Sequence, residues 1–202
     1  IIAVLLFFLP FFTSIDIQTY YSDYGFSYST FFQQPWTLVT SVFLHGSLEH
    51  LLSNILFWFF FGMAVESELG KKKYLLVFFL GAFMGNFLGL FFYAPETLFI
   101  GASAGIFALV GVGMLVRPLD VSFYPLIIPI PLALLGLAYI IFNVYAFIVA
   151  PADNISYIGH IGGVMVGFLF GLHRSGWKKS MKIILITLAV LIAIPLVLIL
   201  FL

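Results

Sequence analysis

Polar side chains interrupt the long apolar stretches of this sequence at a small number of positions, and their types can support chemistry. These residues are His50, Asn54, Asn86, Ser103, Asn143 and His160. A serine beside a histidine can act as a nucleophile with its general base, and side-chain N–H groups can stabilise an oxyanion. In apolar surroundings such groups either join two helices by a hydrogen bond or mark a functional site. Taken singly, Asn86 and Asn143 are interpreted as helix-joining residues.

The composition places these residues in a membrane protein. Of the 202 residues, 63% are hydrophobic and 8% are charged, and the mean hydropathy is +1.21, whereas a soluble domain carries about 25% charged residues. The net charge of zero gives no electrostatic reason to expect nucleic-acid binding, and the absence of cysteine excludes disulfides, thiolate metal sites and a cysteine nucleophile. The sequence therefore predicts an all-α polytopic membrane protein.

Seven apolar segments are separated by polar or charged breaks. They are predicted at residues 1–13, 46–65, 74–93, 100–116, 121–149, 155–173 and 183–202. A helix needs about 20 residues to cross the hydrocarbon core, so the first segment is short. Because it begins at Ile1 without a methionine, we expect a first helix that is trimmed at its start. A signal peptide is the alternative, but the segment has no basic start and no small-residue cleavage site.

Charge is distributed unequally between the two sides that seven alternating crossings define. All eight Lys and Arg residues fall on one side, and the charged residues of the other side are all acidic. The positive-inside rule predicts that the basic side is cytoplasmic. The long outer connection, residues 14–45, is rich in aromatic side chains, which favour a membrane interface. We expect it on or partly in the outer leaflet, and a small folded cap outside the membrane is the alternative.

The candidate nucleophile and base are predicted at one depth. Ser103 lies 14 residues before Arg117, and His160 lies 14 residues before Arg174. Both arginines mark cytoplasmic helix ends, so at about 1.5 Å per residue each side chain is roughly 21 Å above that boundary. Small residues that favour close approach of the two helices are Gly163, Gly167 and Gly171 on the face of the histidine, and Gly101 and Gly105 around the serine.

His50 and Asn54 are four residues apart and therefore share one face of a helix. Counted from Glu66, they lie at roughly 24 and 18 Å, which brackets the same depth. Both can donate hydrogen bonds to a developing oxyanion. His45 and His50 do not share a helix face, and the sequence has no HExxH pattern, so we expect neither a metal nor a cofactor. No carboxylate falls at this depth, and the arrangement is interpreted as a dyad.

Three motifs resemble those of a known family, the rhomboid intramembrane serine proteases. The segment HGSLEHLLSN at His45–Asn54 looks like the second-helix pattern of that family. GASAGIFAL at Gly101–Leu109 looks like its GxSG nucleophile motif, and GHIGG at Gly159–Gly163 resembles its sixth-helix histidine motif. The resemblance covers residues 1–173 and implies a six-helix protease core. A cytoplasmic basic linker and a seventh transmembrane helix would follow within residues 174–202.

The resemblance also implies a reaction, the hydrolysis of a peptide bond within or beside the bilayer. Ser103 would be the nucleophile and His160 the general base. His50, Asn54 and the backbone N–H of Ser103 would form the oxyanion hole. Phe107 would stand where the family often has an aromatic ring that packs on the catalytic histidine, and ordinary core packing is the alternative. The substrates would be single-span membrane proteins, cut near the outer end of their helix, with small residues at the cleaved position.

Two positions depart from the pattern of the family. Ala104 stands where glycine usually follows the serine, and Trp36-Thr37 replaces a Trp-Arg pair in the outer connection. By the same resemblance, His45 would be a structural residue of that connection. Residues 151–156 would form a lid over a cavity that admits water, and segment 121–149 would border the path of the substrate.

Two other functions are left open by the sequence. A catalytically inactive relative that binds transmembrane clients would share the fold, although such relatives typically lack the serine or the histidine, and this chain has both. A small transporter or channel would carry polar residues at several depths and would be expected to show inverted repeats. Here the main polar cluster is predicted at one level, which favours the protease.

Overall fold

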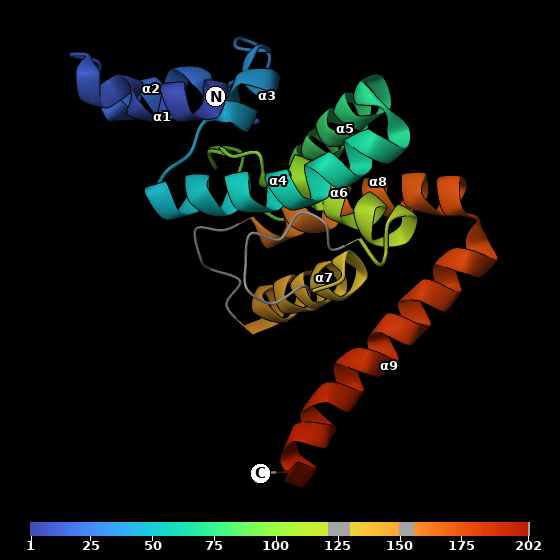
Figure 1. Ribbon diagram of the computed structural model, residues 1–202. Coiled ribbons are helices and arrows are strands. Elements are labelled where there is room, and N and C mark those ends of the chain that lie inside the picture. Colours follow the sequence, from blue (N-terminus) through green and yellow to red (C-terminus); the bar gives the residue numbers. More distant parts are fainter. Residues whose placement is uncertain (121–129, 150–155, 202) are drawn as a thin grey trace.

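The computed structural model describes residues 1–120, 130–149 and 156–201 (Figure 1). Its helices are α1 (Ile2–Phe12), α2 (Ile17–Tyr24), α3 (Thr37–Thr40), the 3-10 helix η1 (Ser41–Phe43), α4 (Leu48–Leu69), α5 (Lys71–Gly89), α6 (Ser103–Val116), α7 (Leu132–Val149), α8 (Tyr157–Ser175) and α9 (Trp177–Phe201). Extended pairing in these residues is confined to one isolated bridge, between Phe26 and Phe99. The predicted all-α class is therefore confirmed. The start of the predicted segment 121–149 and the predicted lid, except for Ser156, lie outside the described residues.

Helix α6 lies at the centre of the bundle. Every residue from Gly105 to Val116 is buried, because α4, α5, α7 and α8 pack around this helix (Figure 1). Its 14 residues span only about 21 Å, which is less than the thickness of the hydrocarbon core. Protein encloses α6 on all sides, which explains why it is apolar all round. Ser103, its first residue, is thus carried by the most enclosed helix of the bundle.

Small residues bring α5, α6 and α8 into backbone contact. A side-chain carbon at Gly163 would collide with the carbonyl oxygen of Ala104, and one at Gly111 would lie 3.1 Å from the carbonyl oxygen of Val164. On the other side of α6, a carbon at Gly85 would lie 2.6 Å from the methyl of Ala104. In lipid, close packing of this kind holds helices together in place of a hydrophobic driving force. It brings α8 within side-chain reach of the start of α6.

Side-chain caps and a glycine turn fix the register of the helices that carry the candidate residues. At the start of α4, the Oγ of Ser47 accepts a hydrogen bond from the backbone N–H of His50 (3.1 Å). At the start of α8, the Oγ of Ser156 accepts one from the backbone N–H of Gly159 (3.3 Å). Gly176, with φ at 81°, turns the chain between α8 and α9 in a region that favours glycine. The polar positions of α4 and α8 therefore start from defined first turns.

A shared carboxylate joins the far ends of three helices. Glu68, near the end of α4, places its Oε2 3.1 Å from the Nε of Arg117, which follows α6. The Oε1 of Glu68 lies 2.9 Å from a terminal guanidinium nitrogen of Arg174, near the end of α8. These arginines are the two residues from which the depths of Ser103 and His160 are counted. The ends of α6 and α8 therefore lie at one level, from which Ser103 and His160 are each 14 residues away.

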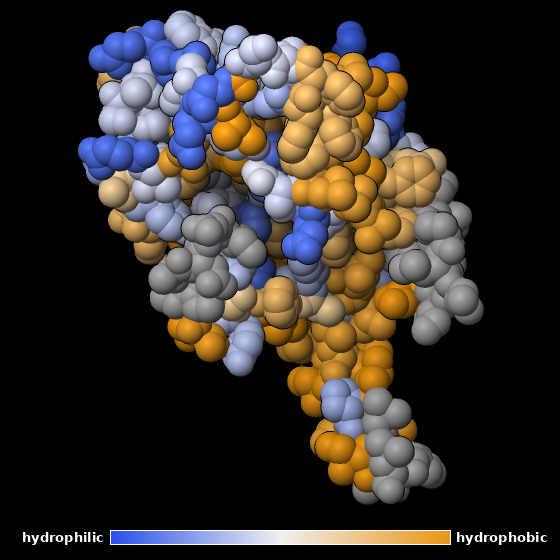
Figure 2. Space-filling view, turned by 90° about the vertical axis from the view of Figure 1, so that its left-hand side faces the viewer, coloured by the Kyte–Doolittle hydropathy of each residue, from blue (hydrophilic) through white to orange (hydrophobic). Residues whose placement is uncertain are grey.

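The stretch at residues 174–182, predicted as a basic linker, is largely helical. Helix α9 begins at Trp177, directly after Gly176, and Lys178, Lys179 and Lys182 lie in its first turns. The helix thus begins earlier than the predicted segment 183–202, because lysine is a good helix former and the turn is completed at one glycine. Helix α9 packs against α7 and α8 over part of its length. The remainder extends away from the bundle as a mostly apolar rod (Figures 1 and 2).

Three helices in the described part of the chain are long and apolar enough to cross a bilayer, judged by length and composition. They are Leu48–Leu69, Leu132–Val149 and Trp177–Val197. Helices α1 and α6 are apolar but shorter. Large apolar side chains on the outer faces, such as Phe142 and Leu185, are 60% and 65% exposed. Such faces suit a lipid environment.

The connection 14–45 is folded by hydrogen bonds within itself, and its Phe26 pairs with Phe99 between α5 and α6. The hydroxyl of Tyr21 donates to the carbonyl oxygen of His45 (2.9 Å), and the indole N–H of Trp36 donates to the carbonyl oxygen of Asp23 (3.1 Å). Thr37, which stands in place of the arginine of the family pattern, is buried and bonds back within its own turn. Trp36 therefore pins this connection without an arginine beside it.

Candidate active site

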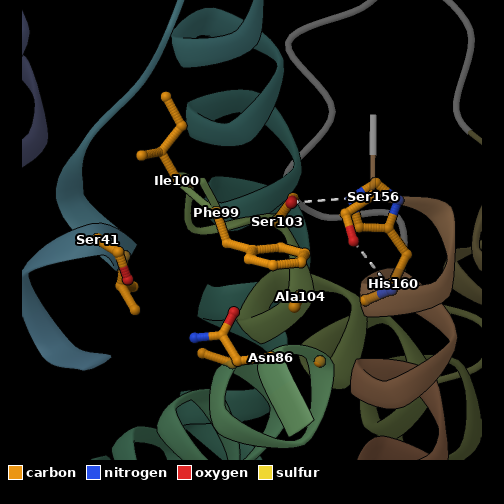
Figure 3. Close-up of a pocket in the computed structure, with 13 residues that line it drawn as sticks. Ser41, Asn86, Phe99, Ile100, Ser103, Ala104, Ser156 and His160 are labelled. Atoms are coloured by element: carbon orange, nitrogen blue, oxygen red, sulfur yellow. Dashed lines mark hydrogen bonds between the residues drawn. The ribbon is translucent and has the colours of Figure 1, made fainter. Parts of the chain in front are cut away.

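Ser103 and His160 meet where the start of α6 faces the first turn of α8. The Oγ of Ser103 lies 2.8 Å from the Nε2 of His160, within hydrogen-bond distance (Figure 3). The histidine is buried, with 7% of its surface exposed, and the serine is partly exposed. Two residues that are 57 positions apart in the sequence are thus placed as a nucleophile and a base require.

A third polar residue contacts the histidine from α7. The Oδ1 of Asn143 lies 2.6 Å from the Nδ1 of His160, and the Nδ2 of Asn143 donates to the carbonyl oxygen of Tyr157 (3.2 Å). The interpretation of Asn143 as a helix-joining residue captured the bond to Tyr157 but missed the contact with His160. Its polar character in an apolar segment was the available signal, and the rotation of α7 that aims it at the ring is not readable from the sequence.

Aromatic rings from three helices stack behind the histidine. The ring of Phe107 is stacked on the imidazole of His160, with centroids 4.3 Å apart and an interplanar angle of 16°. Tyr139 of α7 stacks on Phe107 (4.7 Å, 17°), and Phe57 of α4 stacks on Tyr139 (4.1 Å, 11°). Of the two alternatives for Phe107, the structure shows contact with the histidine rather than core packing alone. The stack fixes one face of the imidazole.

His50 and Asn54 face the turn that precedes Ser103. Gly101 in this turn has φ at 116°, a conformation that favours glycine. A side-chain carbon at Gly101 would lie 2.7 Å from the Nε2 of His50 and 3.8 Å from the Nδ2 of Asn54. The backbone N–H of Gly101 donates to the carbonyl oxygen of Ser41 (2.9 Å), which holds the turn in place. Two side-chain donors therefore lie beside the turn that leads into the candidate nucleophile.

His45 holds the amide of Asn54 from the outer connection. The Nδ2 of Asn54 donates to the Nε2 of His45 (2.8 Å), and the Nδ1 of His45 lies 3.3 Å from the carbonyl oxygen of Phe43. Because the amide N–H₂ can only donate, the Nε2 of His45 accepts and its Nδ1 carries the proton. Burial, and secondarily the neighbouring His50, lower the pKa of His45 to about 4. His45 is therefore neutral at pH 7, as this bond requires.

A small cavity opens beside Ser103 (Figure 3). Its volume of about 30 Å³ is enough for one or two water molecules. The polar residues that line it are Ser41, Asn86, Ser103, Ser156 and His160. Asn86, interpreted above as a helix-joining residue, thus borders the site. The methyl of Ala104 also reaches this cavity while resting against Gly85, so the departure from the family motif is accommodated by a glycine on α5.

The sequence model of the Rhomboid domain matches residues 33–177. Putative rhomboid protease YdcA of Bacillus subtilis (strain 168) is 32% identical over 140 residues, which are 66% of this chain and 64% of that protein. Rhomboid-like protease 3 of Toxoplasma gondii is 36% identical over 88 residues, 44% of this chain and 32% of that protein. RHOMBOID-like protein 7 of Arabidopsis thaliana is 27% identical over 153 residues, 73% of this chain and 47% of that protein.

The chain belongs to the rhomboid family, since the match covers more than half of it. It is an integral membrane protein with the helical bundle of that family, which includes intramembrane serine proteases. The matched region spans less than two thirds of each of these three relatives. Their names include both protease and rhomboid-like protein, and only the first of these names states a catalytic activity.

Proposed function

We propose that this protein is an intramembrane serine endopeptidase in which Ser103 is the nucleophile and His160 the general base. The observation that carries the proposal is the distance of 2.8 Å between the serine Oγ and the histidine Nε2. A serine hydroxyl is a weak nucleophile at neutral pH and needs an adjacent base to accept its proton. The partners come from two helices held in backbone contact, which favours a preorganised pair.

The proposed reaction has two halves. In the first, the Oγ of Ser103 attacks the scissile carbonyl carbon while its proton passes to the Nε2 of His160. The tetrahedral intermediate collapses, the C–N bond breaks, and the leaving amine takes the proton from His160. In the second half, water attacks the acyl ester as His160 accepts a proton from it, and the new carboxylic acid leaves as the proton returns to Ser103.

The oxyanion of each intermediate would be stabilised at the start of α6. The backbone N–H of Ser103 lies in the first turn of this helix, where N–H groups have no partner within the helix. The positive end of the helix dipole favours negative charge at the same place. His50 and Asn54 add side-chain donors beside Gly101. Preorganised donors in a site of low water content are a large source of catalysis in acyl transfer.

We infer that the substrates are membrane proteins with a single transmembrane span, cut toward the outer end of that span. The carboxylate of Glu68 and its two arginines lie at the opposite end of the bundle from Ser103. The positive-inside rule puts this basic end in the cytoplasm, so the site would open toward the outer side of a cell membrane. The cavity beside Ser103 offers room for the water that deacylation consumes.

Labelling with a fluorophosphonate probe tests the proposal directly. The purified protein in detergent is compared with Ser103→Ala, His160→Ala and the matched control Ser67→Ala, whose hydroxyl bonds to Ala64 within α4. We expect labelling of the wild type and of the control only, together with cleavage of a reporter that contains one transmembrane span. A folded wild type that neither labels nor cleaves would instead support an inactive, client-binding relative, and labelling of Ser103→Ala would identify a different nucleophile.

A further inference from the structure

We propose that Asn143 is a positioning residue that completes a Ser103–His160–Asn143 triad. The inference rests on the proposed function, because a positioned base matters only if His160 acts as one. It extends the dyad to a third helix, α7, through a contact of 2.6 Å between the asparagine Oδ1 and the histidine Nδ1. Asn143 is buried, with 4% of its surface exposed, so solvent does not compete for this bond.

The hydrogen-bond pattern of Asn143 leaves one tautomer of the histidine. The amide nitrogen Nδ2 can only donate, and it donates to the carbonyl oxygen of Tyr157 at the start of α8. The carbonyl oxygen Oδ1, which can only accept, therefore faces His160. The Nδ1 of the ring must carry the proton, and the Nε2 is left with a free lone pair. This lone pair points at the Oγ of Ser103 and can accept its proton.

An asparagine suits this position better than a carboxylate. An uncompensated charge buried in apolar surroundings is costly, whereas a neutral amide supplies the same acceptor without a charge. Papain-like proteases use a Cys–His–Asn arrangement with the same division of roles. In the present protein the asparagine also ties α7 to α8 through Tyr157, so one side chain sets the position of the helix and the tautomer of the base.

The surroundings offer the histidine Nδ1 no substitute partner in the adjacent groove. A groove of about 410 Å³ runs between α7 and α8, and Asn143 is the polar member of its lining. The other lining residues are Phe107, Ile140, Val144, Ile161, Val164, Met165, Phe168 and Leu169, all apolar. Phe107 limits rotation of the imidazole by stacking on its face, but a stacked ring does not choose between tautomers. The acceptor oxygen of Asn143 determines which ring nitrogen carries the proton.

The test replaces Asn143 in the chain of residues 1–202 and follows two readouts. Asn143→Leu removes the acceptor, and Asn143→Asp keeps an acceptor oxygen. The control Val144→Ala alters the next residue of α7, which is 40% exposed in the same groove. We expect Asn143→Leu to lower kcat for a single-span reporter by about 10- to 100-fold with little change in KM, the usual size of a misplaced catalytic group. Asn143→Asp should stay within about 10-fold of the wild type, and the control should match it.

The second readout is the ¹⁵N spectrum of the histidine side chains, which reports the tautomer without any need for activity. The chain has four histidines, so His160 is assigned by its loss in His160→Ala. We expect the Nδ1-protonated tautomer in the wild type and a mixture of tautomers in Asn143→Leu. An unchanged kcat or an unchanged tautomer in Asn143→Leu would overturn the inference. A wild type without protease activity would overturn the proposed function, and the spectrum would still decide the role of Asn143.

Discussion

The ring of Phe107 lies almost parallel to the imidazole of His160, with centroids 4.3 Å apart. Phe107 is one helical turn after Ser103 on α6, so the helix that carries the candidate nucleophile also supports the candidate base. The other face of the Phe107 ring is covered by Tyr139 of α7. The imidazole is therefore held on its face by α6 and at its edge by Asn143 of α7.

The stack predicts that Phe107→Leu lowers kcat more than it lowers the stability of the fold. Leucine fills much of the same space but offers no flat surface, so the imidazole gains freedom to tilt away from the Oγ of Ser103. We expect kcat for a single-span reporter to fall by about 10-fold, in line with the cost of a misplaced catalytic group. The thermal unfolding temperature should fall only modestly, because Phe→Leu leaves a much smaller cavity than Phe→Ala would. A fully active Phe107→Leu would show that the ring only fills space.

The sequence predicted correctly those relationships that depend only on how far a residue lies along its own helix. Ser103 and His160 lie at one level because each helix ends at an arginine that binds Glu68, and both arginines are visible as charges in an apolar sequence. Asn143 was assigned too small a role because its contact with His160 depends on how α7 is rotated. Rotation is set by packing, here by Tyr139 against Phe107, and packing partners cannot be read from one helix alone.

Close contact between α6 and α8 predicts that Gly163→Ala lowers both activity and stability, although it adds only one methyl group. The added methyl would collide with the backbone carbonyl of Ala104, which cannot move aside as a flexible side chain can. The helices would be pushed apart, so we expect loss of labelling by a fluorophosphonate and a lower unfolding temperature. Because overpacking typically costs about 1–3 kcal/mol, the protein should still fold at low temperature.

Gly62→Ala provides the matched control for that prediction. It places the same methyl on a buried helical glycine, yet its nearest neighbours, atoms of Tyr74, would lie at an ordinary contact distance of 3.6 Å. Labelling and unfolding temperature should stay close to those of the wild type. Equal effects of the two substitutions would mean that loss of glycine, rather than the approach of α8 to α6, causes the damage.

The placement of His50 beside Gly101 predicts a defect in the chemical step when the imidazole is removed. In His50→Ala, we expect the distance between Ser103 and His160 to stay the same while the proposed oxyanion hole loses a donor. Loss of one such donor typically lowers kcat by about 10²- to 10³-fold, and we expect KM to change much less. His173→Ala, in an exposed last turn of α8, serves as the control. A fall in substrate affinity at constant kcat would instead assign His50 to substrate binding.

The hydrogen bond between His45 and Asn54 predicts that stability falls with acidification. The pKa of His45 in the folded protein is about 4, below the ordinary value of 6.5. Between these two pH values the unfolded chain binds more protons than the folded one, so the free energy of unfolding decreases as pH falls from about 6.5 toward 4. A protonated ring also cannot accept the N–H of Asn54, which loosens one side-chain donor of the site.

Thermal unfolding temperatures measured between pH 6.5 and pH 4 should show the decline in the wild type and a smaller decline in His45→Phe. An undiminished slope in His45→Phe would assign the acid sensitivity to another group.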